Sequence, residues 1–162
     1  MRTRVLIGSA TFLAGLLAGG AFDRAVVGGP AWHHLGANAW AEYSRHADLG
    51  AGLIAYPIEA IGAVVLLFAA IISRRFDAPA RRGRGLALHL AAGFSVVGLV
   101  LTMKAAPIML GLASPQAAAQ TEEAFQGFYF WGLYVRGTVD VLAFACSLCA
   151  LAGATPASSA SG

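Results

Sequence analysis

Charged residues are scarce in this sequence. Aspartate, glutamate, lysine and arginine make up 12% of the 162 residues, about half of their share in typical soluble domains, whereas hydrophobic residues make up 58% and the mean hydropathy is +0.69. A chain this apolar lacks the polar surface of a soluble domain, and a net charge of +3 gives no basic patch for nucleic acid. We therefore predict an all-α membrane protein.

Cysteines are also few, and the common cofactor motifs are missing from the sequence. Cys146 and Cys149 are too few for a disulfide framework. Their CxxC spacing lies near the end of the last apolar run, away from the charged residues, and a membrane quinone reductase would need further cysteines to pass electrons on. The sequence has no phosphate-binding glycine loop and no hydrolase nucleophile motif. We predict no cofactor.

The four histidines do not form a metal-binding motif. His33, His34 and His46 precede or flank the second apolar run at a spacing that matches no compact set of ligands. His89 lies at the opposite end of the predicted bundle from His46, which excludes a haem held between these two. We predict no metal site and interpret the first three histidines as part of a solvated helix face.

Four apolar runs are long enough to cross a bilayer as helices of about 20 residues. They cover residues 5–22, 49–73, 86–112 and 130–151. We predict a four-transmembrane-helix bundle that forms a single domain from residue 1 to residue 153. Residues 154–162 are small and polar, and we predict that this tail is disordered.

The first apolar run has two interpretations. Arg2 and Arg4 before it, and small residues at its end, would suit a cleaved signal peptide. Gly15 and Gly19 form a small-xxx-small pair that suits close helix packing, and a retained first helix completes a bundle of four. We favour the retained helix.

Residues 28–48 change to a mixed polar and aromatic composition. Trp32, Trp40 and Tyr43 recur at helical spacing, while Arg45 falls on another face. Tryptophan and tyrosine favour the headgroup level of a bilayer. We predict an amphipathic helix that lies along the outer membrane surface.

The distribution of arginines predicts the topology. Residues 74–84 join the second and third apolar runs and hold five of the eleven basic residues. Because short loops rich in lysine and arginine stay in the cytoplasm, this loop and both termini are predicted to be cytoplasmic. Residues 23–48 and 114–129 then lie outside, with a short helix near residues 117–125 over the outer mouth of the bundle. We expect a multi-pass protein of the cell membrane.

Charged side chains interrupt three of the apolar runs, at Glu59, Lys104, Arg136 and Asp140. From a rise of about 1.5 Å per residue, they lie about 9 to 15 Å below the outer boundary. A charge that faces hydrocarbon costs about 2.5 to 3.5 kcal/mol, so these groups are expected to face protein or enclosed water. We predict two ion pairs, one between Glu59 and Lys104 and one between Arg136 and Asp140.

Two interpretations of these charges remain open. The ion pairs could serve only to fix the register and rotation of the helices. They could instead form a binding or catalytic site, as ionisable residues inside a membrane commonly do. We predict that Tyr56, Trp131 and Tyr134, which lie toward the outer side of the same runs, contact a ligand. Their alternative role is that of interfacial aromatic residues.

The chain resembles the anthrone oxygenase-like family of small membrane proteins. The likeness rests on the length of the chain, its four apolar runs and the glycines of the first run. It also rests on the segment from Thr102 to Pro107, and on Trp131 with Arg136 at the start of the fourth run. Characterised members of the family oxidise polycyclic anthrones to anthraquinones with molecular oxygen, without an evident metal or flavin.

The resemblance implies a cavity for a flat aromatic substrate. Glu59 or Asp140 would act as a base, and Arg136 or Lys104 would hold the resulting enolate, which makes these four the expected catalytic residues. Our functional hypothesis is an outward-facing charged site that binds a small aromatic or lipophilic molecule. The alternative is a non-enzymatic carrier or accessory subunit whose charges are structural. A carrier would need access from both sides, and the cytoplasmic half of the predicted bundle is apolar apart from His89.

Overall fold

The computed structural model describes residues 2–76, 85–114 and 117–154. Within these ranges the chain is helical and contains no strand. Four helical stretches are long and apolar enough to cross a membrane: Arg2–Leu35, Ala37–Arg74, Gly85–Gly111 and Ala118–Gly153. The prediction of an all-α chain with four membrane-spanning segments is confirmed at this level. Three arginines of the loop used to predict topology, and the tail at 155–162, lie outside the described residues.

Each stretch contains one long α-helix, and three of the stretches also contain shorter helices. The long helices are α1 (Arg2–Asp23), α4 (Gly52–Arg74), α5 (Gly85–Gly111) and α7 (Arg136–Gly153). The shorter ones, which we call the cap, are α2 (Gly29–Leu35), α3 (Ala37–His46) and α6 (Ala118–Phe128). Three π-helical segments join the cap to the long helices: η1 (Arg24–Gly28), η2 (Ala47–Ala51) and η4 (Tyr129–Val135).

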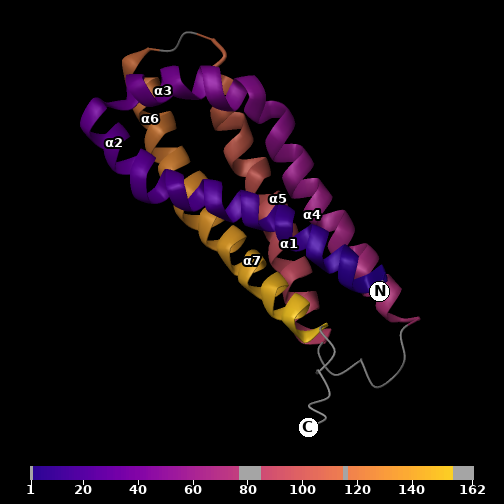
Figure 1. Cartoon of the computed structure of the whole chain (residues 1–162). Coiled ribbons are helices and arrows are strands. Elements are labelled where there is room, and N and C mark those ends of the chain that lie inside the picture. The colour runs from indigo at the N-terminus through magenta and orange to yellow at the C-terminus, as the bar shows by residue number, and fades with distance from the viewer. Residues whose placement is uncertain (1, 77–84, 115–116, 155–162) are drawn as a thin grey trace.

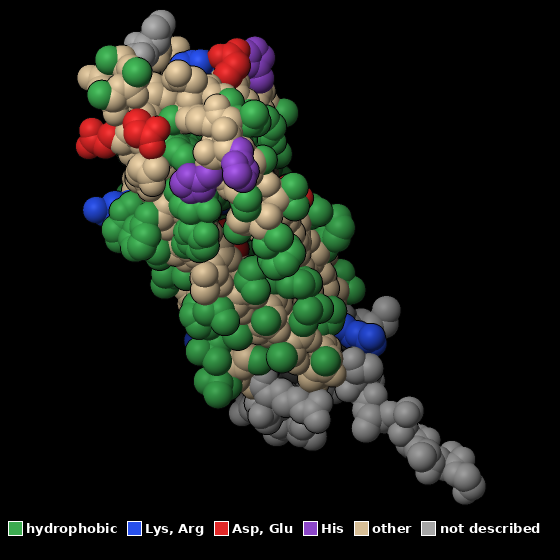
Figure 2. Space-filling view, turned by 90° about the vertical axis from the view of Figure 1, so that its left-hand side faces the viewer, with side chains coloured by type: hydrophobic (Ala, Val, Ile, Leu, Met, Phe, Trp, Pro, Cys, Tyr) green, Lys and Arg blue, Asp and Glu red, His purple; other side chains and the backbone are tan. Residues whose placement is uncertain are grey.

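The long helices lie side by side, and the cap forms one end of the molecule (Figure 1). α1 packs against α4 and α7, and α5 packs against α7. The beginning of α1 and the end of α7 lie together at the other end, where the hydroxyl oxygens of Thr3 and Ser73 are 2.7 Å apart. On the face shown in Figure 2, hydrophobic side chains cover the body of the bundle, and acidic and histidine side chains gather toward the cap.

Alanines, rather than the predicted glycine pair, pack α1 into the bundle. The buried residues of α1 recur every three or four positions and include Ile7, Ala10, Ala14 and Ala18. A Cβ built on Gly15 would lie 3.0 Å from the Phe144 ring, but one built on Gly19 would meet no atom within 4 Å. The prediction that Gly15 and Gly19 act together is therefore wrong for Gly19. Small side chains still bring the helices close, as the composition indicated.

Two separate hydrophobic cores hold the two ends of the molecule. The terminal core lies at the end where α1 begins and α7 ends, and its fully or nearly fully buried residues include Ile7, Leu67, Leu88 and Ala150. The cap core contains Trp32, Ala37, Trp40, Ala41, Met109, Leu112, Phe125, Phe128 and Leu133. The middle of the bundle, between these cores, is where a cavity can form.

The cap differs from the surface helix predicted for residues 28–48. That segment forms two helices that meet at Gly36, where φ is +90°, a conformation that glycine adopts most readily. Trp40 is fully buried and its ring lies 5.4 Å from the rings of both Phe125 and Phe128, with Trp32 buried nearby. The prediction that these tryptophans face lipid headgroups is wrong, because Trp40 packs against α6 and Trp32 packs against Tyr43 of α3.

The short helix predicted near residues 117–125 is α6. Its backbone begins after Ala117, whose N–H donates to the Gln120 side-chain oxygen at 3.3 Å. α6 extends beyond the predicted residues, through Gly127 to Phe128, and leads into η4. The Arg45 guanidinium Nε donates to the Leu112 carbonyl at 2.9 Å and so ties α3 to the end of α5.

Candidate functional site

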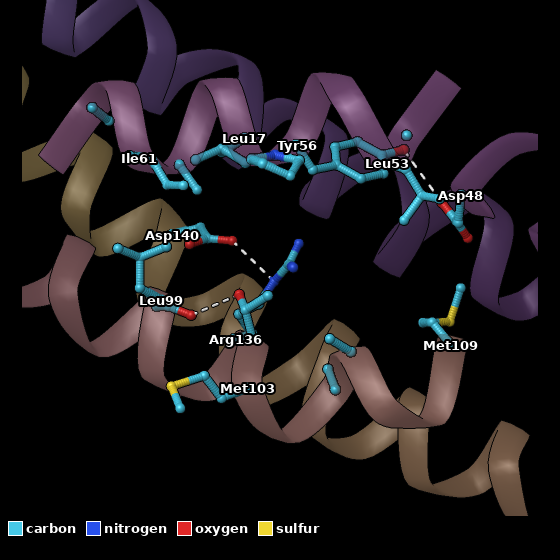
Figure 3. A pocket seen from close by; sticks show the side chains of 18 of the residues that line it. Leu17, Asp48, Leu53, Tyr56, Ile61, Leu99, Met103, Met109, Arg136 and Asp140 are labelled. Carbon is cyan, nitrogen blue, oxygen red and sulfur yellow. Dashed lines mark hydrogen bonds and ion pairs between the residues drawn. The ribbon is translucent and has the colours of Figure 1, made fainter. Parts of the chain in front are cut away.

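A cavity of about 370 Å³ lies between the cap core and the terminal core. Its walls come mainly from α4 and α5, with contributions from α1, η1, η2, α7 and the end of α6 (Figure 3). Most of its lining is apolar, and the charged or phenolic side chains that line it are Arg24, Asp48, Tyr56, Arg136 and Asp140. An apolar cavity with a few polar groups is the usual form of a small-molecule site.

Arg136 and Asp140 form the predicted ion pair. They lie four residues apart at the start of α7, so their side chains share one helix face. The Arg136 Nε lies 3.4 Å from the Asp140 Oδ2, and the two side chains are 20% and 10% exposed. Both residues line the cavity.

The outer part of the Arg136 guanidinium is directed into the cavity. Figure 3 shows its terminal nitrogens pointing toward the centre of the space, while its Nε faces Asp140. Among the residues that the structure describes, these terminal nitrogens have no hydrogen-bond or ion-pair partner. The contact with Asp140 is made by Nε. A guanidinium held at one edge and free at the other can donate to an oxygen of a bound molecule.

A glycine on the facing helix makes room for the Asp140 carboxylate. A Cβ built on Gly98 of α5 would lie 2.9 Å from the Asp140 Oδ1, which is closer than side chains normally approach. One turn further along α5, the Thr102 hydroxyl donates to the Gly98 carbonyl at 2.9 Å, so it satisfies its polar atom within its own helix. The position of Asp140 therefore depends on the close approach of α5 and α7.

Glu59 and Lys104 do not form the predicted pair. Lys104 is exposed, and its ammonium lies 5.7 Å from the centre of the Trp131 ring. Lys104 follows Thr102 by two residues, so its side chain lies about 200° around the α5 axis from that of Thr102. Thr102 lines the cavity and Lys104 does not. Glu59 is half-buried, forms no ion pair within the described part of the chain and does not line the cavity. A similar predicted depth is necessary for pairing, but the rotation of the helices about their axes keeps these two side chains apart.

A second charged group, which the sequence analysis missed, lies at the cap end of the cavity. Arg24 of η1 forms an ion pair with Asp48 of η2, and their side chains are 16% and 6% exposed. The Arg24 Nη2 also donates to the Tyr56 hydroxyl at 2.5 Å, and that hydroxyl donates to the Asp48 Oδ1 at 3.3 Å. This network links the end of the first span to the beginning of the second. We call it the cap network.

A signal for this network was present in the sequence. Arg24 and Asp48 flank the two ends of the segment that joins consecutive apolar runs, so the antiparallel spans place them at one level. Opposite charges at one level near a membrane boundary are candidates for pairing. The predicted topology places both residues in the external segment 23–48 and does not pair them.

Of the three aromatic residues predicted to contact a ligand, one lines the cavity and two do not. Tyr56 lines the cavity and belongs to the cap network. Trp131 and Tyr134 are not among the lining residues and are partly exposed, at 37% and 49%. The Tyr134 hydroxyl donates to the Tyr129 hydroxyl at 3.2 Å. The structure therefore does not place Trp131 and Tyr134 in the site.

The three histidines of the cap do not gather into a metal site. Across residues 2–76, 85–114 and 117–154, no three histidine, cysteine or acidic side chains are close enough together to hold an ion. The His33 ring makes edge contacts with Phe125 and Tyr129, at ring-centre distances of 5.1 and 4.4 Å. His33 therefore packs as an aromatic ring on the cap.

Comparison with known proteins gives no relative from which a function could be transferred. No protein-family model matches the chain, and neither a curated protein nor a solved structure matches it. We therefore infer a function from the cavity and from the five charged or phenolic side chains that line it.

Proposed function

We propose that this chain is a multi-pass protein of the cell membrane whose cavity binds a small lipophilic molecule. The observation that carries the proposal is the Arg136 guanidinium, which is tied to Asp140 at Nε and open to an apolar cavity at its terminal nitrogens. A volume of about 370 Å³ falls within the range typical of small-molecule pockets. Apolar walls would hold the body of the ligand, and Arg136 would orient it through one oxygen.

The charges of the site favour a ligand without net charge. Arg136 is balanced by Asp140, and Arg24 is balanced by Asp48, so the charged residues that line the cavity sum to zero. Adding an anion would leave one charge uncompensated in a poorly solvated space, which is strongly unfavourable. A neutral molecule with a carbonyl or phenolic oxygen would accept from Arg136 without this cost.

A second candidate function is a cofactor-free oxygenase. A carboxylate and a guanidinium lie together on one wall of the cavity, as removal of a proton from an activated carbon requires. Asp140 would accept the proton, Arg136 would hold the enolate oxygen, and molecular oxygen would take the electrons, leaving a ketone and water. Oxygen uptake on adding anthrone to purified protein tests this candidate, which fails if Asp140→Asn consumes oxygen at the wild-type rate.

The carrier alternative has less support. Transport would require the cavity to open toward the end where the termini lie, and the terminal core fills that end with buried side chains such as Leu67 and Leu88. Opening it would expose well-packed apolar surface. A pocket that is closed at that end suits binding or catalysis better than passage.

We further propose that both termini face the cytoplasm and the cap lies outside, from the arginine distribution. Single cysteines at Asn38 and Gln120, two exposed cap positions, should react with an impermeant thiol reagent on intact cells once Cys146 and Cys149 are replaced. A cysteine at Ala80 should stay unlabelled until the cells are opened. Labelling of Ala80→Cys but not of the two cap positions would invert the topology.

Filling the cavity tests the binding proposal. Ala106→Phe places a ring in the space that α5 lines, whereas Ala55→Phe adds the same ring at an exposed position of α4 that does not line it. Small molecules extracted from purified protein and identified by mass spectrometry should include a neutral lipophile in the wild type and in Ala55→Phe. This lipophile should fall below about a tenth of its wild-type amount in Ala106→Phe. Equal retention by all three proteins would refute the proposal.

A further inference from the structure

The mouth of the cavity can be located from residues that line it and are also exposed. Leu53 and Ile61 of α4 are 52% and 53% exposed, and Met103 and Leu110 of α5 are 75% and 54% exposed. All four line the cavity. A side chain that borders the space and is more than half exposed must lie at its rim. The rim therefore runs along the gap between α4 and α5.

The rim is apolar and lies on the side of the bundle. Leu53 and Ile61 are eight residues apart on α4, with Pro57 between them, and these three form one stripe of the helix. Met103 and Leu110 form the matching stripe on α5, seven residues apart. The four rim side chains carry no charge and no hydrogen-bonding group. A mouth that opened to water would have polar residues at its edge, whereas this one suits contact with hydrocarbon.

Neither end of the bundle offers an alternative route. The cap core closes one end with side chains that have almost no exposure, including Trp40, Leu112 and Phe125. Beneath it, Arg24 and Asp48 join the first span to the second across the same end. The terminal core closes the opposite end. The gap between α4 and α5 is the remaining side on which the lining residues are exposed.

Prolines weaken both helices at this gap. Pro57 lies within α4 and Pro107 within α5. Because proline has no N–H, the carbonyl four residues earlier loses its usual helical donor, and these carbonyls belong to Leu53 and Met103. The two rim residues thus lie where each helix is easiest to bend. A small bend at either proline would widen the mouth without disturbing the two cores.

We propose that the ligand reaches the cavity from the bilayer, through the mouth between α4 and α5, and is therefore a membrane-dissolved lipophile rather than a water-borne solute. This inference rests on the proposed binding function and adds the route and the solubility class of the ligand. A molecule that arrives sideways brings its apolar body past Met103 and Ile61. Its oxygen then meets Arg136 inside.

Photolabelling in lipid vesicles tests the route. Benzophenone, a neutral aromatic ketone, is dissolved in the bilayer of vesicles that contain the purified protein, and a sulfonated benzophenone is supplied in the water. After illumination, peptide mass spectrometry counts adducts at Leu17, which lines the cavity on α1 and is not one of the four rim residues. Labelling of Leu17 by the lipid-dissolved probe should exceed labelling by the aqueous probe by about tenfold or more.

Closing the mouth should slow this labelling. Ile61→Trp with Met103→Trp enlarges both sides of the rim. We expect about tenfold slower labelling of Leu17, because the larger side chains obstruct the mouth and a modest rise in the entry barrier lowers a rate by that factor. Val100→Trp is the matched control, because Val100 is 57% exposed on α5 and does not line the cavity. Its rate should equal that of the wild type.

The outcomes separate the route from the binding function. The lateral route is wrong, while the cavity remains a binding site, under either of two results. One is that Leu17 is labelled as fast in the rim variant as in the wild type. The other is that the aqueous probe labels Leu17 of the wild type as well as the lipid-dissolved probe does. If neither probe labels Leu17 in the wild type although exposed side chains such as Val100 are labelled, both the route and the proposed function are overturned.

Discussion

Asp140→Leu is expected to lower the free energy of unfolding by about 3 to 5 kcal/mol, because it leaves the Arg136 guanidinium without its buried partner. Arg136→Met should cost a similar amount by leaving the Asp140 carboxylate unpaired. Combining the two changes removes both charges and fills the space with apolar side chains. The double variant should therefore lose much less stability than the sum of the single changes.

Unfolding in detergent, followed by heat or denaturant for the four proteins, measures this coupling. Glu42 and Arg45 supply a matched control, because they form an ion pair at the cap surface with side chains 63% and 33% exposed. Glu42→Gln should change stability by only about 0.2 to 1 kcal/mol, as exposed pairs usually do. Additive losses for Arg136→Met and Asp140→Leu would show that the two residues are not energetically paired.

The parts of the fold that the sequence predicted correctly depend on short-range patterns. Membrane spans are set by runs of about 20 apolar residues, which need no knowledge of the neighbours. The Arg136 and Asp140 pair is also local, because residues four apart on one helix always share a face. Both features could be read from the chain in isolation.

The incorrect predictions concern features that depend on how the helices are rotated and packed. The sequence predicts similar depths for Glu59 and Lys104, but depth along a helix gives no information on which way a side chain points around it. Arg24 and Asp48 meet only because two successive spans are brought together at the cap. The two residues are 24 positions apart in sequence, so their contact requires a tertiary arrangement that the local pattern does not define.

The cap shows a second limit of the sequence pattern. Tryptophan at helical spacing near a predicted membrane boundary is typical of headgroup contact. The same spacing serves equally well to bury Trp40 against Phe125 and Phe128 of a helix about 85 residues later. A hydrophobic stripe shows that a face needs to be covered. Whether lipid or protein covers it follows from the tertiary fold.

The largest functional effect is expected when the cation facing the cavity is removed from a protein that remains folded. The variant that combines Arg136→Met with Asp140→Leu keeps the cavity neutral and apolar, but it lacks the donor that would orient a carbonyl or phenolic oxygen. Loss of a hydrogen bond to a charged group corresponds to roughly a tenfold to hundredfold weaker affinity. Lys104→Met is the matched control, since Lys104 is a cation of the same bundle that does not line the cavity.

The most direct test of this account is the amount of neutral lipophile that copurifies with these three proteins, measured by mass spectrometry and normalised to folded protein. We predict that the wild type and Lys104→Met retain the same molecule in equal amounts. The folded fraction of the variant that combines Arg136→Met with Asp140→Leu should retain less than about a tenth of it. Equal retention by the double variant would contradict the central claim that Arg136 holds a ligand in the cavity.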